Sequence, residues 1–86
     1  MRLLWEERAW EEYLYWQLQD KKTLKRLNCL LKDMQRDCFN GIGKPEPLKE
    51  NLKGWWSRRI DDVNRVVYKQ QGEDIIIVSC KGHYEK

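Results

Sequence analysis

The stretch WWSRRIDDVNRVVYKQQGEDIIIVSCKGHY, residues 55–84, predicts three β-strands joined by turns. We expect these strands at residues 56–60, 65–70 and 74–80. Each run is rich in β-branched or aromatic residues, and turn-forming residues separate the runs. The third run is apolar on both faces, which is typical of a strand in the middle of a covered sheet. The tail after it, with His83 and Tyr84, should therefore leave a rigid, buried strand.

Basic residues on the first two of these strands predict a positively charged sheet face. They are Arg58, Arg59, Arg65 and Lys69. The net charge of +3 is too modest to imply nucleic-acid binding by itself. Its distribution says more, because residues 44–69 hold seven basic and four acidic side chains. A cationic sheet face beside the only histidine suggests a site for a polyanion.

The N-terminal half predicts one strand and two helices. We expect a strand at residues 2–5, a helix at residues 6–18 and a second helix at residues 21–36 with Asp20 as its N-cap. The order β-α-α-β-β-β predicts a single α+β domain over residues 1–86. In it the two helices pack on a mainly antiparallel four-stranded sheet. Basic residues on the second helix are read either as a solvated face, which we favour, or as a second nucleic-acid surface.

The size and the cysteine usage limit the possibilities further. A chain of 86 residues has a small core, which we expect to be rich in its five tryptophans. Three widely spaced cysteines without a CxxC pair predict neither a disulfide framework nor a zinc site. We expect Cys29 and Cys80 to be small core residues with free thiols, as suits a reducing cytoplasm. No signal-peptide pattern or membrane-spanning apolar run is present in the sequence.

The segment after the second helix predicts a long irregular loop. Residues 44–53 contain two leucines, Leu48 and Leu52, which should pin the loop to the core through a short helical turn. Glu46 stands between two prolines, and the restricted backbone of those residues should hold its carboxylate in a fairly fixed place.

Four residues form an inventory for metal-free cleavage of RNA: Glu46, Arg65, His83 and Tyr84. A carboxylate can take the proton from a 2′-hydroxyl, an arginine can stabilise the phosphorane, and an imidazolium can protonate the departing 5′-oxygen. Each residue also has an ordinary interpretation. Glu46 can be a plain loop charge, and His83 and Tyr84 can be a frayed terminus. Arg65 can pair with Asp61 or Asp62, and a one-residue register slip would turn it to the opposite face.

Six motifs stand in order along nearly the whole chain. They are Leu4-Trp5, WEEYLYW at residues 10–16, GIGKPEPL at 41–48, WSRRI at 56–60, RVVY at 65–68 and His83-Tyr84. Together they resemble the YoeB-type toxins of the RelE superfamily. The resemblance implies a compact microbial-ribonuclease fold and a ribosome-dependent endoribonuclease that cleaves messenger RNA in the ribosomal A site. It also implies a YefM-type antitoxin as partner and, by analogy, a possible homodimer.

The resemblance assigns roles to individual positions. Glu46 would be the general base, Arg65 the transition-state cation and His83 the general acid. Neither a metal ion nor a cofactor is implied.

The same resemblance assigns substrate contacts and shows two departures. Tyr84 would stack on or orient the substrate, and Lys49 and Arg59 would hold phosphates. Gly82 stands where the family commonly has an aromatic residue, and residues 85–86 extend the chain past the family's usual end. We expect the glycine and the added glutamate to weaken activity.

Two other functions are compatible with this sequence. One is a ParE-like toxin that acts by binding a target such as gyrase, and the other is a plain RNA-binding module. The presence of the whole acid–base set favours the nuclease. We expect the antitoxin to offer an acidic, partly disordered segment that covers the basic face or distorts the tail.

Overall fold

The computed structural model describes residues 1–83, so the predictions for Tyr84 and for residues 85–86 lie outside it. Its elements are β1 (Arg2–Trp5), α1 (Glu7–Gln19), α2 (Lys21–Arg36), β2 (Glu46–Pro47), the 3₁₀-helix η1 (Glu50–Leu52), β3 (Trp56–Arg59), β4 (Arg65–Gln71) and β5 (Asp74–Ser79). Every predicted helix and strand is confirmed to within one residue at each end. The short helical turn expected in the long loop is η1.

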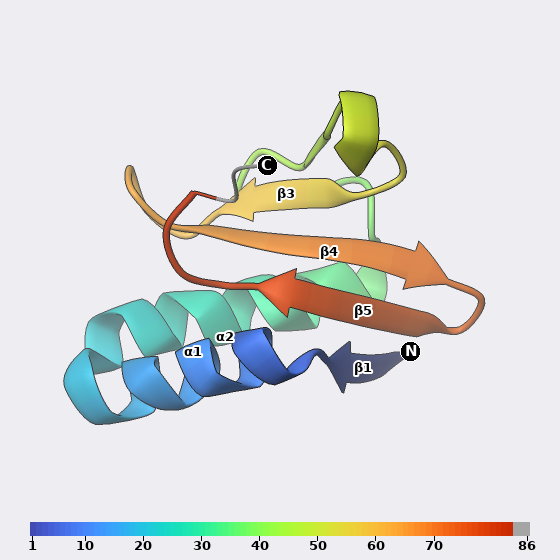
Figure 1. Ribbon diagram of the computed structural model, residues 1–86. Coiled ribbons are helices and arrows are strands. Elements are labelled where there is room, and N and C mark those ends of the chain that lie inside the picture. Colours follow the sequence, from blue (N-terminus) through green and yellow to red (C-terminus); the bar gives the residue numbers. More distant parts are fainter. Residues whose placement is uncertain (84–86) are drawn as a thin grey trace.

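The described strands form one mixed sheet in the order β1-β5-β4-β3-β2 (Figure 1). The α+β class is confirmed, and the sheet has one strand more than predicted. The additional strand, β2, has two residues and pairs antiparallel with the edge of β3, with Glu46 opposite Ser57. So short a strand has no alternating pattern, and Pro47 is accepted there because an edge strand has no further neighbour to bond.

Strand β5 occupies the interior of the sheet, as its sequence predicts. It pairs in parallel with β1 and antiparallel with β4, and its Ile75 and Ile77 are fully buried. Two side chains of α1 form hydrogen bonds with the backbone of Cys80, the residue that follows β5. The indole Nε1 of Trp16 donates to the carbonyl of Cys80 at 2.9 Å, and the Cys80 N–H donates to a carboxylate oxygen of Glu12 at 2.7 Å. The C-terminal tail therefore starts from a fixed point.

Helices α1 and α2 lie side by side and cover one face of the sheet (Figure 1). The cap on α2 is confirmed, since Asp20 accepts a hydrogen bond from the Thr23 N–H at 3.1 Å. The core between helices and sheet is mainly aliphatic. Its largest fully buried members besides Arg58 are Tyr68, Leu27, Leu30, Met34, Ile75, Ile77 and Val66. The expectation of a tryptophan-rich core was wrong in part, because Trp16 is buried whereas Trp10 is 45% exposed.

Of the two cysteines predicted to lie in the core, one does and the other does not. Cys80 is buried as expected, whereas Cys29 is exposed. Leu27, Leu30 and Leu31 of α2 turn into the core, so the position between them faces outward. None of the described helices is long and apolar enough to cross a membrane.

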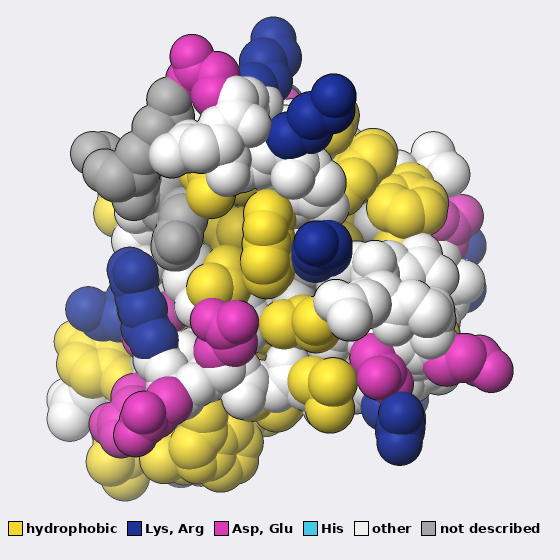
Figure 2. All heavy atoms as spheres, turned by 45° about the vertical axis from the view of Figure 1, so that its right-hand side comes forward, with side chains coloured by type: hydrophobic (Ala, Val, Ile, Leu, Met, Phe, Trp, Pro, Cys, Tyr) yellow, Lys and Arg dark blue, Asp and Glu magenta, His cyan; other side chains and the backbone are white. Residues whose placement is uncertain are grey.

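The prediction for Arg58 was also wrong, because this residue does not lie on a cationic sheet face. Successive residues of a strand point to opposite faces, and Arg58 points to the helix side, where its side chain is fully buried. Arg59, one residue on, is exposed. On the face toward the β4–β5 turn, Figure 2 shows basic side chains interspersed with acidic and apolar ones rather than joined in one patch.

Candidate active site

The register of β3 against β4 decides which side chains share a face. Trp56 lies opposite Tyr68 and Arg58 opposite Val66, and these pairs alternate with Ser57 opposite Val67 and Arg59 opposite Arg65. Tyr68 and Val66 belong to the core beneath the helices. Because directly opposed residues point to the same side, Ser57, Arg59, Arg65 and Val67 lie on the face away from the helices. Arg65 is therefore on the open face, which the sequence alone left unsettled.

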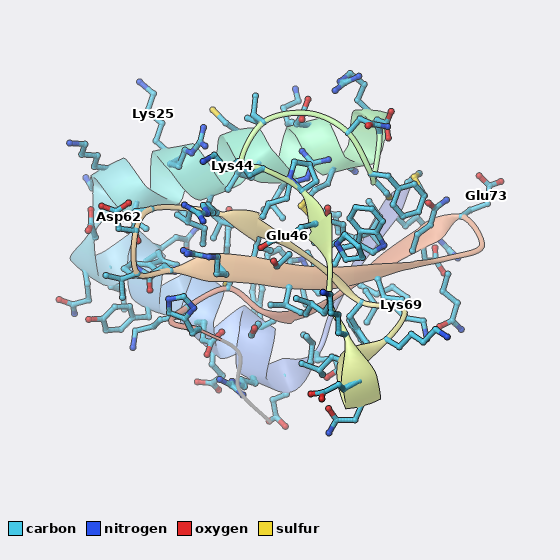
Figure 3. All side chains as sticks on the ribbon, turned by 90° about the horizontal axis from the view of Figure 1, so that it is seen from above. Lys25, Lys44, Glu46, Asp62, Lys69 and Glu73 are labelled. Atoms are coloured by element: carbon cyan, nitrogen blue, oxygen red, sulfur yellow. The ribbon has the colours of Figure 1, made fainter. Side chains whose placement is uncertain are left out.

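A small hollow on this open face brings three of the four predicted catalytic residues together. It has a volume of about 180 Å³ and is lined by Glu46, Leu48, Ser57, Arg65, Val67 and His83. Glu46 comes from β2 at the sheet edge, Arg65 from the start of β4, and His83 from the tail after β5. Figure 3, seen from above, shows Glu46 beside β3, with which its strand pairs at the sheet edge.

A reversal of the chain after α2 delivers Glu46 to this position. Gly43 and Lys44 both adopt left-handed backbone conformations, with φ of +82° and +53°. The Gly43 carbonyl accepts a hydrogen bond from the Arg59 N–H at 2.6 Å, so the reversal is tied to β3. A Cβ on Gly43 would stand 2.7 Å from a methyl group of Leu30. Position 43 thus requires glycine for both its backbone conformation and its close packing.

The buried guanidinium of Arg58 forms hydrogen bonds with the segment between α2 and β2, on the helix side of the sheet. Its Nη1 donates to Asp33 Oδ2 at 2.6 Å, and Nη1 and Nη2 together donate to three backbone carbonyls of the segment between α2 and β2. Its Nε donates to the hydroxyl of Tyr68 at 3.0 Å. Burial raises the pKa of Tyr68, so this phenol stays neutral. The loop that carries Glu46 is therefore built on an arginine that the sequence suggested was at the surface.

Asp33 is the charge partner of Arg58, and its environment favours the carboxylate. Hydrogen bonds from Arg36, from the Ile42 N–H and from Arg58 lower its pKa to about 2. The ion pair stabilises the fold and lies outside the hollow.

Three further hydrogen bonds position Arg65 and the tail. The guanidinium Nη1 of Arg65 donates to the carbonyls of Asp61 and Asn64, at 2.7 and 3.1 Å. The structure thus ties Arg65 to turn carbonyls, and among residues 1–83 it shows no ion pair between Arg65 and Asp61 or Asp62. The Arg65 N–H also donates to the Gly82 carbonyl at 3.1 Å, which fixes the residue just before His83.

The remaining predicted residues are placed less centrally. Arg59 is exposed on the same face as Arg65 and directly opposite it, but it is not part of the hollow's lining. Lys49 is exposed at the start of η1, also outside the lining. Tyr84 lies outside the described residues. Sequence reasoning missed Leu48, Ser57 and Val67; the alternation on β3 and β4 was the signal for the last two.

The hollow is open to solvent, and its charges are of both signs. Glu46 and His83 are exposed, and Arg65 is partly buried. A carboxylate, a guanidinium and an imidazole thus converge on one surface that a polyanion can approach. Within the described part of the chain, no group of three His, Cys, Asp or Glu side chains is arranged to hold a metal ion.

A larger hollow lies elsewhere, along the outer side of the helical pair. It measures about 620 Å³ and is lined by Gln17, Leu18, Lys21, Leu24, Lys25, Asn28, Cys29 and Lys32. This lining contains no carboxylate and no histidine, so the hollow has no acid–base pair. Its size does not make it the better candidate for catalysis.

Comparison with known proteins identifies close relatives over nearly the whole chain. Residues 5–84 match a family model described as the YoeB-like toxin of bacterial type II toxin–antitoxin systems. The toxin YoeB of Synechocystis sp. is 51% identical over 86 residues, covering 100% of both chains.

Two solved structures from Staphylococcus aureus are also similar. One is a YoeB dimer, with a TM-score of 0.90, 46% identity and 98% coverage of each chain. The other is a YoeB–YefM complex, with a TM-score of 0.90, 45% identity and the same coverage.

Proposed function

This chain belongs to the YoeB-like toxins of bacterial type II toxin–antitoxin systems, and we propose that it is an endoribonuclease that cleaves messenger RNA on the ribosome. The observation that carries the proposal is the hollow that Glu46, Arg65 and His83 share. These residues lie far apart in the sequence, and the fold brings a carboxylate, a permanent cation and an imidazole to one surface.

In the proposed reaction the Glu46 carboxylate takes the proton from a ribose 2′-hydroxyl. The 2′-oxygen then attacks the adjacent phosphorus, forming a new P–O bond. The guanidinium of Arg65 stabilises the added negative charge of the phosphorane, and protonated His83 gives its proton to the departing 5′-oxygen as the P–O5′ bond breaks. The products are a 2′,3′-cyclic phosphate and a 5′-hydroxyl. No metal ion takes part in this scheme, and DNA is not cleaved because it lacks the 2′-hydroxyl.

The openness of the hollow bears on how the substrate is held. A shallow site with exposed Glu46 and His83 surrounds little of a nucleotide, so the message must be positioned largely by other contacts. The ribosome can supply them in the A site. In this proposal Arg59 and Lys49 bind flanking phosphates, and Tyr84 stacks on or orients a base.

The partners follow from the same family. We propose a YefM-type antitoxin that inhibits the chain by covering the open face, and a cytoplasmic location where messenger RNA and ribosomes occur. The S. aureus relatives form a complex with YefM and a dimer, and a homodimer is proposed for this chain by the same analogy.

The test is a cell-free translation reaction in which the new 5′ ends of a defined message are mapped. Wild-type protein should generate ends within the occupied codon, whereas Glu46→Gln, His83→Gln and a reaction without ribosomes should not. Glu73→Gln is the matched control, since this exposed carboxylate lies at the far end of the sheet (Figure 3). Translation arrest by all variants without new ends would reject the nuclease and support a toxin that acts by binding its target.

A further inference from the structure

The turn between β3 and β4 contacts the C-terminal tail at one defined point. The side-chain oxygen Oδ1 of Asn64 accepts a hydrogen bond from the Gly82 N–H at 2.7 Å. The Gly82 carbonyl accepts from the Arg65 N–H at 3.1 Å. Both backbone groups of Gly82 are thus engaged by two consecutive residues, the last of the turn and the first of β4, and His83 is the next residue of the chain.

The orientation of the Asn64 amide is itself fixed by Asp61. The amide nitrogen Nδ2 donates to both carboxylate oxygens of Asp61 at 3.1 Å. Asp61 Oδ1 also accepts from the backbone N–H groups of Val63 and Asn64, at 2.8 and 2.7 Å. With its nitrogen directed at Asp61, the amide presents its oxygen to Gly82. Burial alone would raise the pKa of Asp61, but hydrogen bonds from Asn64 and Val63 outweigh it and hold that pKa below its usual value.

The same turn also fixes the cation of the site. The Arg65 guanidinium donates through Nη1 to the carbonyls of Asp61 and Asn64. One four-residue turn therefore determines where Arg65 stands and where the tail with His83 begins. Hydrogen bonds from Arg65 to the turn, and between Gly82 and both Asn64 and Arg65, set their relative position.

Gly82 is suited to this attachment. Its φ of +72° lies in the left-handed region, which glycine adopts without the penalty that other residues incur. The glycine that was expected to weaken activity is therefore the residue whose backbone attaches the tail to the rest of the fold.

We propose that Asn64 is a positioning residue for the reaction: it holds Gly82 so that His83 stands beside Arg65. The proposal rests on the proposed nuclease function, because positioning matters only if His83 transfers a proton. Removing the Asn64 side chain should release the tail while leaving Glu46, Arg65 and His83 in the chain. A small misplacement of a general acid lowers the rate of the chemical step far more than it lowers substrate binding.

The experiment compares wild type, Asn64→Ala and the control Asp62→Asn, which alters an exposed residue of the same turn. The first readout is hydrogen exchange of the Gly82 amide by NMR, where its glycine signal is readily resolved. We expect exchange to accelerate about tenfold or more in Asn64→Ala and to stay unchanged in the control. This readout does not depend on any enzymatic activity.

The second readout is ribosome-dependent cleavage of a defined message. In Asn64→Ala we expect kcat to fall roughly 10- to 100-fold with KM changed by less than about threefold, and thermal stability to remain close to wild type. Unchanged Gly82 exchange would overturn the proposal, and so would accelerated exchange with wild-type kcat. If the wild-type protein cleaves no message, the proposed function fails and the positioning role for the reaction fails with it. Accelerated Gly82 exchange in Asn64→Ala would then show that the hydrogen bond exists, so the two failures are distinguishable.

Discussion

Replacing Arg58 with methionine should destabilise the protein by about 3 to 5 kcal/mol, the usual effect of removing one partner of a buried ion pair. Arg58 is fully buried and donates five hydrogen bonds, to Asp33, to Tyr68 and to three backbone carbonyls. Methionine fills most of the volume, so little of the loss comes from a cavity. The side chain of Asp33 is 16% exposed and keeps Arg36 as a partner, which favours the lower end of the range.

The magnitude is large for a domain of this size. Proteins are stable by about 5–15 kcal/mol in total, and each kcal/mol shifts the melting temperature of a small domain by roughly 4–8 °C. A loss of about 3 kcal/mol therefore predicts a melting temperature lower by roughly 12–24 °C. Urea unfolding followed by tryptophan fluorescence measures the change directly, and an unchanged slope against urea would show that the unfolded state is unaffected.

Arg59→Met is the matched control. It makes the same chemical change one residue later, on the opposite face of the same strand, where the arginine is exposed. We expect its effect on the free energy of unfolding to stay within about 0.5 kcal/mol. Equal losses of stability in the two variants would refute the assignment of Arg58 to the core and Arg59 to the open face.

The pH dependence gives a second signature of the same ion pair. The pKa of Asp33 is lowered to about 2 in the folded protein, first by Arg36, then by the Ile42 N–H and then by Arg58. A lowered pKa contributes stability above the ordinary value of about 4, and that contribution is lost as the pH falls toward 2. In Arg58→Met the pKa of Asp33 should rise, so stability should fall less between pH 5 and pH 2 than in wild type.

Three further predictions concern the loop, the thiols and the C-terminus. Gly43→Ala should lower the free energy of unfolding by about 2 kcal/mol or more, because the new Cβ would lie 2.7 Å from Leu30 and the left-handed backbone would be strained. Gly72→Ala is the control: it has a φ of +61° but no atom near the new Cβ, so it should lose only about 1 kcal/mol. A thiol reagent should modify Cys29 quickly in the native protein, and Cys38 and Cys80 only after unfolding. Both of these are buried, and burial raises their pKa, to about 12 for Cys80. Fast labelling of all three cysteines in the native protein would contradict this packing. A form that ends at Tyr84 should cleave faster than the full chain, because it lacks the glutamate expected near the RNA phosphate, and equal rates would disprove that explanation.

Local sequence patterns were enough to predict the described elements other than β2, and the residues that could carry chemistry. The apolar periods, the Asp20 cap and the turn residues predicted both helices and four strands, because each of these signals acts within a few residues of the chain. The motifs indicated the family and the residues to examine, including Glu46, Arg65 and His83. None of these inferences depended on which distant segments of the chain are in contact.

Tertiary structure decided what the sequence left open, since those features depend on contacts between distant residues. Arg58 and Arg59 are identical and adjacent, and only the pairing of β3 with β4 sends one into the core and the other to the open face. The period of a strand is two, so a shift of one residue exchanges these roles without changing the pattern. The hydrogen bond from Gly82 to Asn64 spans 18 residues and joins a turn to a tail, and no local signal marks it. The sequence was therefore sufficient to predict the residues of the candidate site, and the fold determined their positions and contacts.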